Sequence, residues 1–424
     1  MRRSGRTADA ARQGAPEELP KSAMSVSLAP RPPVPAVSRL NSIYSALPTT
    51  IFEVMSGLAR THQAVNLGQG FPDDPGPLDV RQKAADAVVD GWNQYPPMMG
   101  LADLRQAAAV HYKHWQGLDL DPESEVMVTS GATEALAGAL FSLIEPGDEV
   151  VLFQPLYDAY LPLVQRAGGI PRLVRLEPPS WRITAEKLEA AFSPRTKVVL
   201  FNNPQNPTGI VHSREEMQLI ADFCIRFDVI AVCDEVWEHV IFDGRRHLPM
   251  MAIPGMRERT VKISSAGKIF GMTGWKVGLV FAQPELMRVL GKAHQFLTFT
   301  TPPNLQAAVA YGLGKEDAYF EDMRADLQRS RDRLAKGLSD LGFPVLPSAG
   351  TYFLSVDLAA IDPTLDDEAF CLDLVKTHGV AAIPVSAFYA QDAVRSVVRF
   401  CFAKRDATLD AALERLAGAL RNGR

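Results

Sequence analysis

The chain has 424 residues, of which 47% are hydrophobic and 22% are charged, an ordinary composition for a globular protein with a large core. The formal net charge of -5 argues against a nucleic-acid-binding surface. No uninterrupted apolar run reaches the roughly 18 residues that a bilayer-spanning helix needs. We therefore expect a protein of two or three domains that has neither nucleic acid nor membrane as a partner.

The four cysteines occur singly, at positions 224, 233, 371 and 401, and none forms a C-x-x-C pair. This spacing argues against a disulfide framework and against a zinc site. Cys233 and Cys401 stand inside apolar runs, where a small buried thiol is the usual occupant. We expect no metal site, and a reducing, cytoplasmic location.

Residues 1–40 differ from the rest of the chain because Arg, Ala, Ser and Pro dominate them. Such a segment buries too little apolar surface to offset its ordering entropy, so we predict a disordered N-terminal extension. Glu17 and Glu18 argue against a transit peptide, and the lack of an apolar core argues against a signal peptide.

Short apolar runs alternate with amphipathic stretches through the middle of the chain. Each run has Gly, Pro or polar residues at its ends, which is typical of buried strands; the runs are 125–130, 149–155, 197–204, 229–235, 260–265 and 278–282. Residues 213–227 are typical of the intervening helices, with Ser213 as the starting signal. This alternation predicts an α/β fold with a mostly parallel sheet covered on both faces.

The pattern changes after about residue 315. A long charged helix is predicted over 319–342, followed by short strands at 350–358 and 396–403 and a final helix, which together indicate a smaller α+β domain. The domain prediction is thus a disordered extension (1–40), an N-terminal segment packing with the small domain (41–80), a large domain (81–315) and a small C-terminal domain (316–424).

Two polar clusters that follow predicted strands form turns. The sequence SGATEAL at 130–136 is a Ser-Gly turn that opens a helix, and its free backbone N–H groups would suit a phosphate. The sequence NNPQNPTG at 202–209 is a rigid turn in which prolines flank the segment that holds Asn206. A conformationally fixed asparagine can hold a hydrogen bond to a ligand oxygen.

Two further clusters carry charge. Asp234 closes the apolar run VIAVC, where a carboxylate is unfavourable unless it is paired or used. Lys268 lies in the small-residue turn SSAGKIFGMTGWKVG, and Lys276 follows eight residues later. A lysine among apolar residues and a second cation can lose its proton near neutral pH and act as a nucleophile.

The sequence excludes two nucleotide-binding motifs. A phosphate loop would need Ser or Thr after Lys268 and glycine at position 262, but the chain has Ile269 and Lys262 there. Gly68 and Gly70 lack the third glycine of a dinucleotide fingerprint, because Asp73 stands in its place.

In combination, the four clusters resemble those of the fold-type-I pyridoxal-phosphate aminotransferases of class I/II, over residues from about 40 to 420. Within this class the chain most resembles the bacterial methionine aminotransferases and the kynurenine–oxoglutarate (glutamine) transaminase group. The segments that carry this resemblance are LPTTIFEVMSGLA, NLGQGFPDD, GTYFLSVDL, HGVAAIPVSAF and RFCFAK. It implies an aspartate aminotransferase-like fold, with a mostly parallel seven-stranded sheet, a smaller α+β C-terminal domain, and pyridoxal 5'-phosphate bound in the large domain.

The resemblance also implies a role for each matched residue. Lys268 would carry the cofactor as a Schiff base and move a proton, and Asp234 would keep the pyridine nitrogen protonated. Asn206 would hold the ring's 3-hydroxyl oxygen, and Tyr157 would stack on the ring. Tyr95 would reach the phosphate of a partner subunit, which implies a homodimer. The matched phosphate-binding positions are Gly131, Ala132, Thr133, Ser265 and Lys276.

Arg399 is the predicted anchor for the substrate carboxylate. It stands in the apolar context VVRFCF, where a guanidinium needs an anionic partner, and its fork geometry suits a carboxylate. Asn206 and the backbone at Gly70 match further positions on the carboxylate side.

Two positions depart from the family pattern. Trp237 stands where the family usually has tyrosine, so we expect the cofactor to bind with altered basicity of its Schiff base. Ile51 stands near the place of a tryptophan in kynurenine-preferring enzymes, which favours a flexible apolar or an aromatic donor.

The sequence therefore predicts a transaminase of amino acid metabolism. Its donor would be an apolar or aromatic L-amino acid such as methionine, phenylalanine or tyrosine, with glutamine and kynurenine as further candidates, and its acceptor a 2-oxo acid. A succinyldiaminopimelate aminotransferase, which would need an extra cation for the distal carboxylate, and a cysteine-S-conjugate β-lyase stay open as alternatives. A cofactor-binding regulator lacks support, because residues 1–40 hold no helix-turn-helix pattern.

Overall fold

The computed structural model describes residues 40–420, so the predicted disordered extension lies almost entirely outside the described residues. The chain divides into two units, residues 1–46 and 47–424. In the first unit, the helix α1 (Ser42–Ala46) begins at Asn41, whose Oδ1 accepts hydrogen bonds from the backbone N–H groups of Ile43 and Tyr44.

The second unit contains a seven-stranded sheet in the order β2-β8-β7-β6-β5-β3-β4. The strand β8 is antiparallel to both of its neighbours, and the other pairs are parallel, which confirms the predicted mostly parallel sheet. The strands are β2 (Val126–Thr129), β3 (Glu149–Gln154), β4 (Ile170–Arg175), β5 (Thr196–Asn202), β6 (Ile230–Asp234), β7 (Thr260–Ser265) and β8 (Gly278–Phe281).

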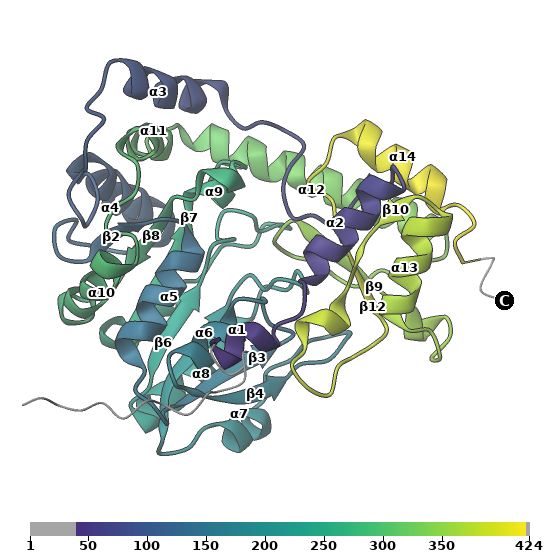
Figure 1. Ribbon diagram of the computed structural model, residues 1–424, viewed down its shortest axis with the longest axis horizontal. Helices are drawn as coiled ribbons and strands as arrows, with labels where there is room; N and C mark the ends of the chain where they lie inside the picture. Colours follow the sequence, from purple (N-terminus) through teal and green to yellow (C-terminus); the bar gives the residue numbers. More distant parts are fainter. Residues whose placement is uncertain (1–39, 421–424) are drawn as a thin grey trace, which may run out of the picture. The chain divides into compact units, whose positions relative to one another are not determined.

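Helices cover both faces of this sheet, which explains why the strands are continuously apolar. On β3, Val150 and Leu152 pack into the core beside the helix α5 (Ala132–Leu143), whereas Val151 and Phe153 pack into a second core beside the helix α8 (Arg214–Phe227) (Figure 1). The helix α8 begins with a capping box, in which the side chains of Ser213 and Glu216 each accept a hydrogen bond from the other's backbone N–H.

The remaining helices of the second unit surround the sheet and the C-terminal region. The helix α10 packs on α5, and α11 packs on α3 and α4. The helices are α2 (Ile51–Thr61), α3 (Leu78–Val89), α4 (Ala102–Gln116), α5 (Ala132–Leu143), α6 (Tyr160–Arg166), α7 (Ala185–Ala191), α8 (Arg214–Phe227), α9 (Ala266–Ile269), α10 (Pro284–Leu297), α11 (Pro303–Leu313), α12 (Asp317–Asp340), α13 (Asp367–Thr377) and α14 (Asp406–Leu416).

Two small sheets lie in the region of α13 and α14. An antiparallel sheet has the order β11 (Ile383–Pro384), β12 (Val397–Cys401) and β9 (Phe353–Asp357), and β1 (Val65–Asn66) pairs in parallel with β10 (Val380–Ala381). Figure 1 shows the long helix α12 running from α11 towards α14. We propose the boundaries 41–80, 81–315 and 316–424 for the domains, and the pairing of β1 with β10 supports placing the segment around β1 with the small domain.

The strand β4 is absent from the sequence prediction. Pro171 and the arginines Arg172 and Arg175 interrupt its apolar pattern, which is tolerated because β4 lies at the edge of the sheet. The four cysteines are buried and free, which confirms the burial predicted for Cys233 and Cys401. Among residues 40–420, no helix combines the length and apolarity that crossing a bilayer requires.

Candidate active site

A cavity of about 160 Å³ lies at the carboxyl ends of the parallel strands. The strands β2, β5, β6 and β7 each end in or just before residues that line it. Nine of the twelve residues predicted for the site line this cavity: Gly131, Ala132, Thr133, Tyr157, Asn206, Asp234, Ser265, Lys268 and Lys276.

Asp234 ends β6, and its side chain is buried at the cavity wall. Its Oδ2 accepts a hydrogen bond of 2.6 Å from the hydroxyl of Tyr160. Burial raises the pKa of the Asp234 carboxyl, and the hydrogen bond from Tyr160 opposes that rise. A buried carboxylate at the wall of a cavity suits a cationic group placed opposite it.

Lys268 lies in the short helix α9, directly after β7. The backbone carbonyl of Lys268 accepts a hydrogen bond of 3.0 Å from the hydroxyl of Tyr352. The Nζ atom of Lys268 lies 4.4 Å from the centre of the Trp237 ring. Burial lowers the pKa of Lys268 to about 8, and the charges of Arg399 and Lys276 contribute to the lowering. This amine is therefore available as a nucleophile near neutral pH.

The predicted phosphate turn forms the N-terminus of α5. Gly131 caps this helix with φ = 82°, and a Cβ atom added there would lie 3.0 Å from Cε and 3.2 Å from Nζ of Lys276. The glycine thus lets the ammonium group approach the helix end. Free N–H groups, the helix dipole and a lysine charge together suit a dianion, and the hydroxyl-bearing residues Thr133 and Ser265 line the same cavity.

Arg399 lies in β12, fully buried beside the cavity. Its Nη1 donates a hydrogen bond of 2.8 Å to Oδ1 of Asn206, and its Nη2 donates one of 2.9 Å to the carbonyl of Gly68. Its Nε is buried and has no hydrogen-bond partner among the described residues. Burial lowers the pKa of Arg399 to about 9. A buried cation with an unpaired donor is suited to bind an anion.

Gly70 and Tyr95 do not line the cavity. A Cβ atom at Gly70 would lie 2.6 Å from the ring of Phe353, so glycine is needed where the chain passes this ring. Tyr95 has an exposed fraction of 80% and packs edge-to-face against Phe299, with ring centres 5.4 Å apart. Its predicted contact with a partner subunit therefore stays a prediction.

Tyr160 and Asn202 also line the cavity, although the sequence did not predict them for the site. The side chain of Asn202 accepts a hydrogen bond from the backbone N–H of Asn206 and donates one to the carbonyl of Asp234, each 2.8 Å long. It ends β5 just as Asp234 ends β6, so its position could have revealed it. Tyr160 follows Tyr157 by three residues, a weaker signal.

A doubly wound sheet with a near-neutral lysine amine, a buried carboxylate and an anion pocket defines a fold of the aspartate aminotransferase type. The profile of the family described as "Aminotransferase class I and II" matches residues 62–416. The chain therefore belongs to the class I and II aminotransferases.

Three relatives illustrate this membership. A probable N-succinyldiaminopimelate aminotransferase of Mycobacterium tuberculosis is 45% identical, with 87% of this chain and 96% of the relative covered. The methionine aminotransferase of Escherichia coli is 41% identical with the same coverage. Human kynurenine–oxoglutarate transaminase 1 is 37% identical, with 85% and 93% covered. The solved structure of an N-succinyldiaminopimelate aminotransferase from Mycobacterium tuberculosis superposes with a TM-score of 0.87 at 45% identity, covering 90% of this chain and all of that one.

Class I and II aminotransferases use pyridoxal phosphate, so the chain is a pyridoxal-phosphate-dependent transaminase acting on an amino acid and a 2-oxo acid. The donor set of the cavity fits this cofactor. Lys268 offers an amine to the aldehyde, Asp234 a carboxylate to the ring nitrogen, and the turn at Gly131 with Lys276 an anion pocket to the phosphate.

Proposed function

We propose that this transaminase takes the amino group of an apolar or aromatic L-amino acid, such as methionine, phenylalanine or tyrosine, and that glutamine and kynurenine are further donors. The proposal rests mainly on the three aromatic rings that surround Arg399. Its guanidinium carbon lies 3.9 Å from the ring centre of Phe353, 5.2 Å from that of Phe388 and 5.4 Å from that of Phe52. An anchored α-carboxylate would place the amino acid side chain near this apolar, aromatic wall.

The charged residues that line the cavity also support an apolar or aromatic donor. Among the described residues that line it, the only cationic side chains are those of Lys268 and Lys276, and both have a cofactor role in this proposal. A second carboxylate on the substrate would therefore lack a dedicated cation among the described residues that line this cavity.

Each residue has a defined task in the proposed reaction. When bound, pyridoxal phosphate supplies an electron sink that acidifies the Cα–H bond of the amino acid attached to it. Lys268 Nζ, whose pKa burial lowers to about 8, would accept that proton and return it. Asp234, held by a hydrogen bond from Tyr160, would offer its carboxylate to the ring nitrogen of the bound cofactor. Asn206 joins the two halves of the site, because its side chain also accepts a hydrogen bond from Arg399.

We also propose that the enzyme is a homodimer in which Tyr95 contacts the phosphate of the partner subunit. Several large apolar side chains near Tyr95 in the sequence or the fold are exposed, among them Trp92 (77%), Phe296 (84%) and Phe299 (39%). Exposed apolar side chains of this size favour burial against another chain. A mixed dimer of Tyr95→Phe and Lys268→Ala subunits with partly restored activity would support shared sites.

A cytoplasmic location remains part of the proposal. The four free, buried cysteines support it, because a reducing compartment keeps thiols unpaired.

N-succinyldiaminopimelate aminotransferase is the second candidate, and the relative at 45% identity favours it. A distal carboxylate would then have to find its cation in the partner subunit or outside the described residues. The two candidates differ in the charge that the pocket must accept, so a substrate comparison can separate them.

The deciding experiment is a panel of amino donors with one 2-oxo acid, followed by identification of the products. We expect methionine and the aromatic amino acids to have the highest kcat/KM. A higher kcat/KM for N-succinyldiaminopimelate would establish the second candidate instead. Pyruvate and ammonia released from a cysteine conjugate without any oxo acid would indicate the β-lyase.

A further inference from the structure

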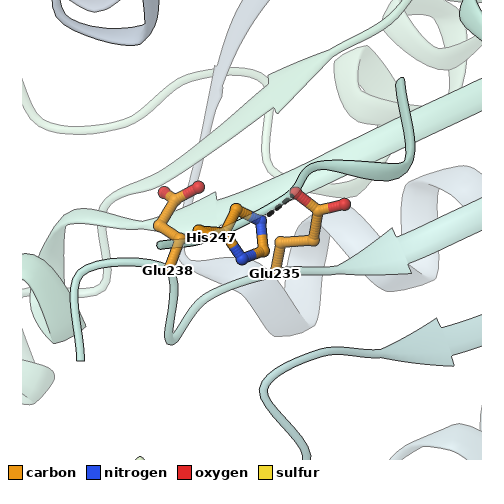
Figure 2. A group of neighbouring side chains, drawn as sticks. All are labelled: Glu235, Glu238 and His247. Atoms are coloured by element: carbon orange, nitrogen blue, oxygen red, sulfur yellow. Dashed lines mark hydrogen bonds and ion pairs between the residues drawn. The ribbon is translucent and has the colours of Figure 1, made fainter. Parts of the chain in front are cut away.

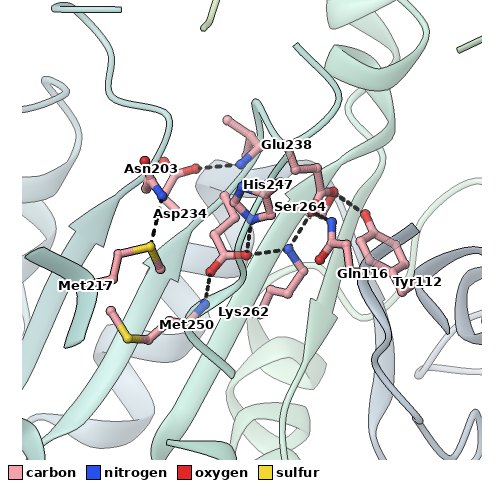
Figure 3. A network of polar contacts seen from close by, with 12 residues as sticks. Tyr112, Gln116, Asn203, Met217, Asp234, Glu238, His247, Met250, Lys262 and Ser264 are labelled. Atoms are coloured by element: carbon pink, nitrogen blue, oxygen red, sulfur yellow. Dashed lines mark hydrogen bonds and ion pairs between the residues drawn. The ribbon is translucent and has the colours of Figure 1, made fainter. Parts of the chain in front are cut away.

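A buried ion cluster lies directly behind the cofactor cavity. The Nζ atom of Lys262 donates hydrogen bonds of 2.5 Å to Oε2 of Glu235 and to Oε2 of Glu238. All three side chains are buried, and Lys262 has no exposed surface at all. Figure 3 shows Lys262 on its strand, with its amine directed towards the carboxylate of Glu238.

Each carboxylate of the cluster has further partners. Glu238 accepts hydrogen bonds from the hydroxyls of Tyr112 and Ser264 and one of 2.7 Å from Nε2 of Gln116. Glu235 accepts one from the backbone N–H of Met250 at 3.0 Å. All four carboxylate oxygens of Glu235 and Glu238 thus accept hydrogen bonds, which restricts both side chains to one arrangement.

The cluster resembles a metal site in its spacing. The ligand atoms of Glu235, Glu238 and His247 lie within 4.8 Å of one another (Figure 2), and His247 Nε2 is 2.7 Å from Glu235 Oε2. The ammonium group of Lys262 already contacts both carboxylates, however, and supplies the positive charge that a metal would bring. The cluster is therefore an internal ion network.

The segment that follows β6 connects this network to the cofactor cavity. Asp234 and Trp237 line the cavity, whereas the intervening Glu235 and the following Glu238 belong to the network. The ion pairs of Glu235 and Glu238 therefore fix the backbone of residues 234–238 on the side away from the cavity. Any shift of either glutamate would move a residue of the cavity wall with it.

The strand β7 makes the same connection on its side of the cavity. Lys262 and Ser264 point to the network, the next residue, Ser265, lines the cavity, and Lys268 follows in α9. The strands β6 and β7 pair in parallel, with Cys233 of β6 opposite Lys262 of β7. One network therefore links both segments that carry the charged cofactor-facing residues.

We propose that the Glu235–Lys262–Glu238 network is a positioning device that holds Asp234, Trp237 and Ser265 in the arrangement that pyridoxal phosphate requires. The proposal rests on the cofactor-binding roles given to these residues above. The physical basis is electrostatic. The carboxylates of Glu235 and Glu238 would repel each other and the carboxylate of Asp234, and the ammonium group of Lys262 offsets this repulsion and holds both glutamates on the side away from the cavity.

The test is a charge-neutral double variant, Lys262→Met with Glu235→Gln. Removing Lys262 alone would leave two buried carboxylates without a cation and would endanger folding, whereas the double variant leaves only Glu238, which still accepts hydrogen bonds from Tyr112, Ser264 and Gln116. The matched control is Arg257→Met with Glu125→Gln, which removes another cation–carboxylate pair, 2.8 Å apart, at the amino end of β2. Two quantities are measured on the full chain after removal of the cofactor: the Kd for pyridoxal phosphate and the melting temperature of the apoprotein.

We expect the network variant to bind pyridoxal phosphate about tenfold more weakly or worse, and the control to keep its Kd within about twofold even where its melting temperature falls equally. A folded network variant with the Kd of the wild type would overturn the proposal. If the first variant does not fold, Glu238→Gln with Ser264→Ala replaces it under the same criterion. Failure of the wild type to bind the cofactor would contradict the proposed function instead.

Discussion

The indole ring of Trp237 faces the amine of Lys268, with Nζ 4.4 Å from the ring centre. The same indole packs edge-to-face against Tyr352, whose hydroxyl holds the backbone of Lys268. Trp237 therefore restrains the lysine with an aromatic face at a position where the family usually has a phenol. An aromatic face stabilises a nearby cation but offers no hydroxyl to a ring oxygen of the cofactor.

Replacing Trp237 with tyrosine should change the acidity of the lysine-bound cofactor. A phenol that donates to the ring oxygen stabilises the unprotonated form, so we expect the pKa of the visible absorption band to fall by about 0.5 to 1 unit, the equivalent of one hydrogen bond. The measurement is a spectroscopic pH titration of the loaded enzyme. Trp115→Tyr, in an aromatic cluster with Phe320, serves as the control. Superimposable curves for Trp237→Tyr and the wild type would reject this role.

The lowered pKa of Lys268 predicts how cofactor capture depends on pH. Only the neutral amine attacks the aldehyde, and burial lowers the pKa of this lysine to about 8. The neutral fraction, and with it the rate of capture by the apoprotein, should rise about tenfold from about pH 7 to about pH 9. Stopped-flow absorbance with pyridoxal phosphate measures this rate. Pyridoxamine phosphate, which has no aldehyde, is the control, and an equal rise in its binding rate would remove Lys268 as the cause.

The sequence predicted much of the sheet, because strands buried on both faces are continuously apolar. The runs at 149–155 and 229–235 correspond to β3 and β6. Apolarity does not encode strand direction, so the antiparallel β8 was not foreseen. The edge strand β4 was not predicted, because its partly exposed position allows arginines that interrupt the apolar pattern.

Residues of the candidate site were predictable where a charged side chain interrupts an apolar stretch of the sequence. Asp234 and Arg399 stood out as charges inside apolar runs, and the structure places both beside the cavity. Tyr160 could not be found this way, because a tyrosine in a helix is ordinary in the sequence. Lys262 was noticed only as a residue that breaks a phosphate-loop motif. Its partners lie more than twenty residues away in the chain, and only folding brings them together.

Arg399→Lys should weaken substrate binding selectively. Lysine keeps the charge but loses the planar fork that binds Asn206, the Gly68 carbonyl and a carboxylate together. Losing one charge-assisted hydrogen bond, about 1.5–3 kcal/mol, corresponds to a KM for the amino acid roughly 10- to 100-fold higher. The Kd for pyridoxal phosphate should stay unchanged. Arg395→Lys, an exposed arginine paired with Asp366 just before the same strand, is the control. A Kd for the cofactor that rises in step with KM would contradict the assignment to substrate.

Gly131→Ala tests the anion pocket, and the chain provides a matched control in Gly147. Both glycines have positive φ, 82° and 99°, so alanine strains the backbone at either position. A Cβ atom at Gly131 would press on Lys276 within 3.0 Å, whereas one at Gly147 would meet nothing within 4 Å. We therefore expect similar losses of stability, about 1 kcal/mol each, in thermal melts of the two variants.

The two variants should differ in phosphate binding. Displacement of the Lys276 ammonium from the end of α5 removes one charge-assisted contact, so Gly131→Ala should bind pyridoxal phosphate about tenfold more weakly, with little change for pyridoxal, which lacks the phosphate. Gly147→Ala should bind both as the wild type does. Equal weakening of pyridoxal and pyridoxal phosphate in Gly131→Ala would mean that this turn shapes the cavity as a whole and does not specifically bind the phosphate.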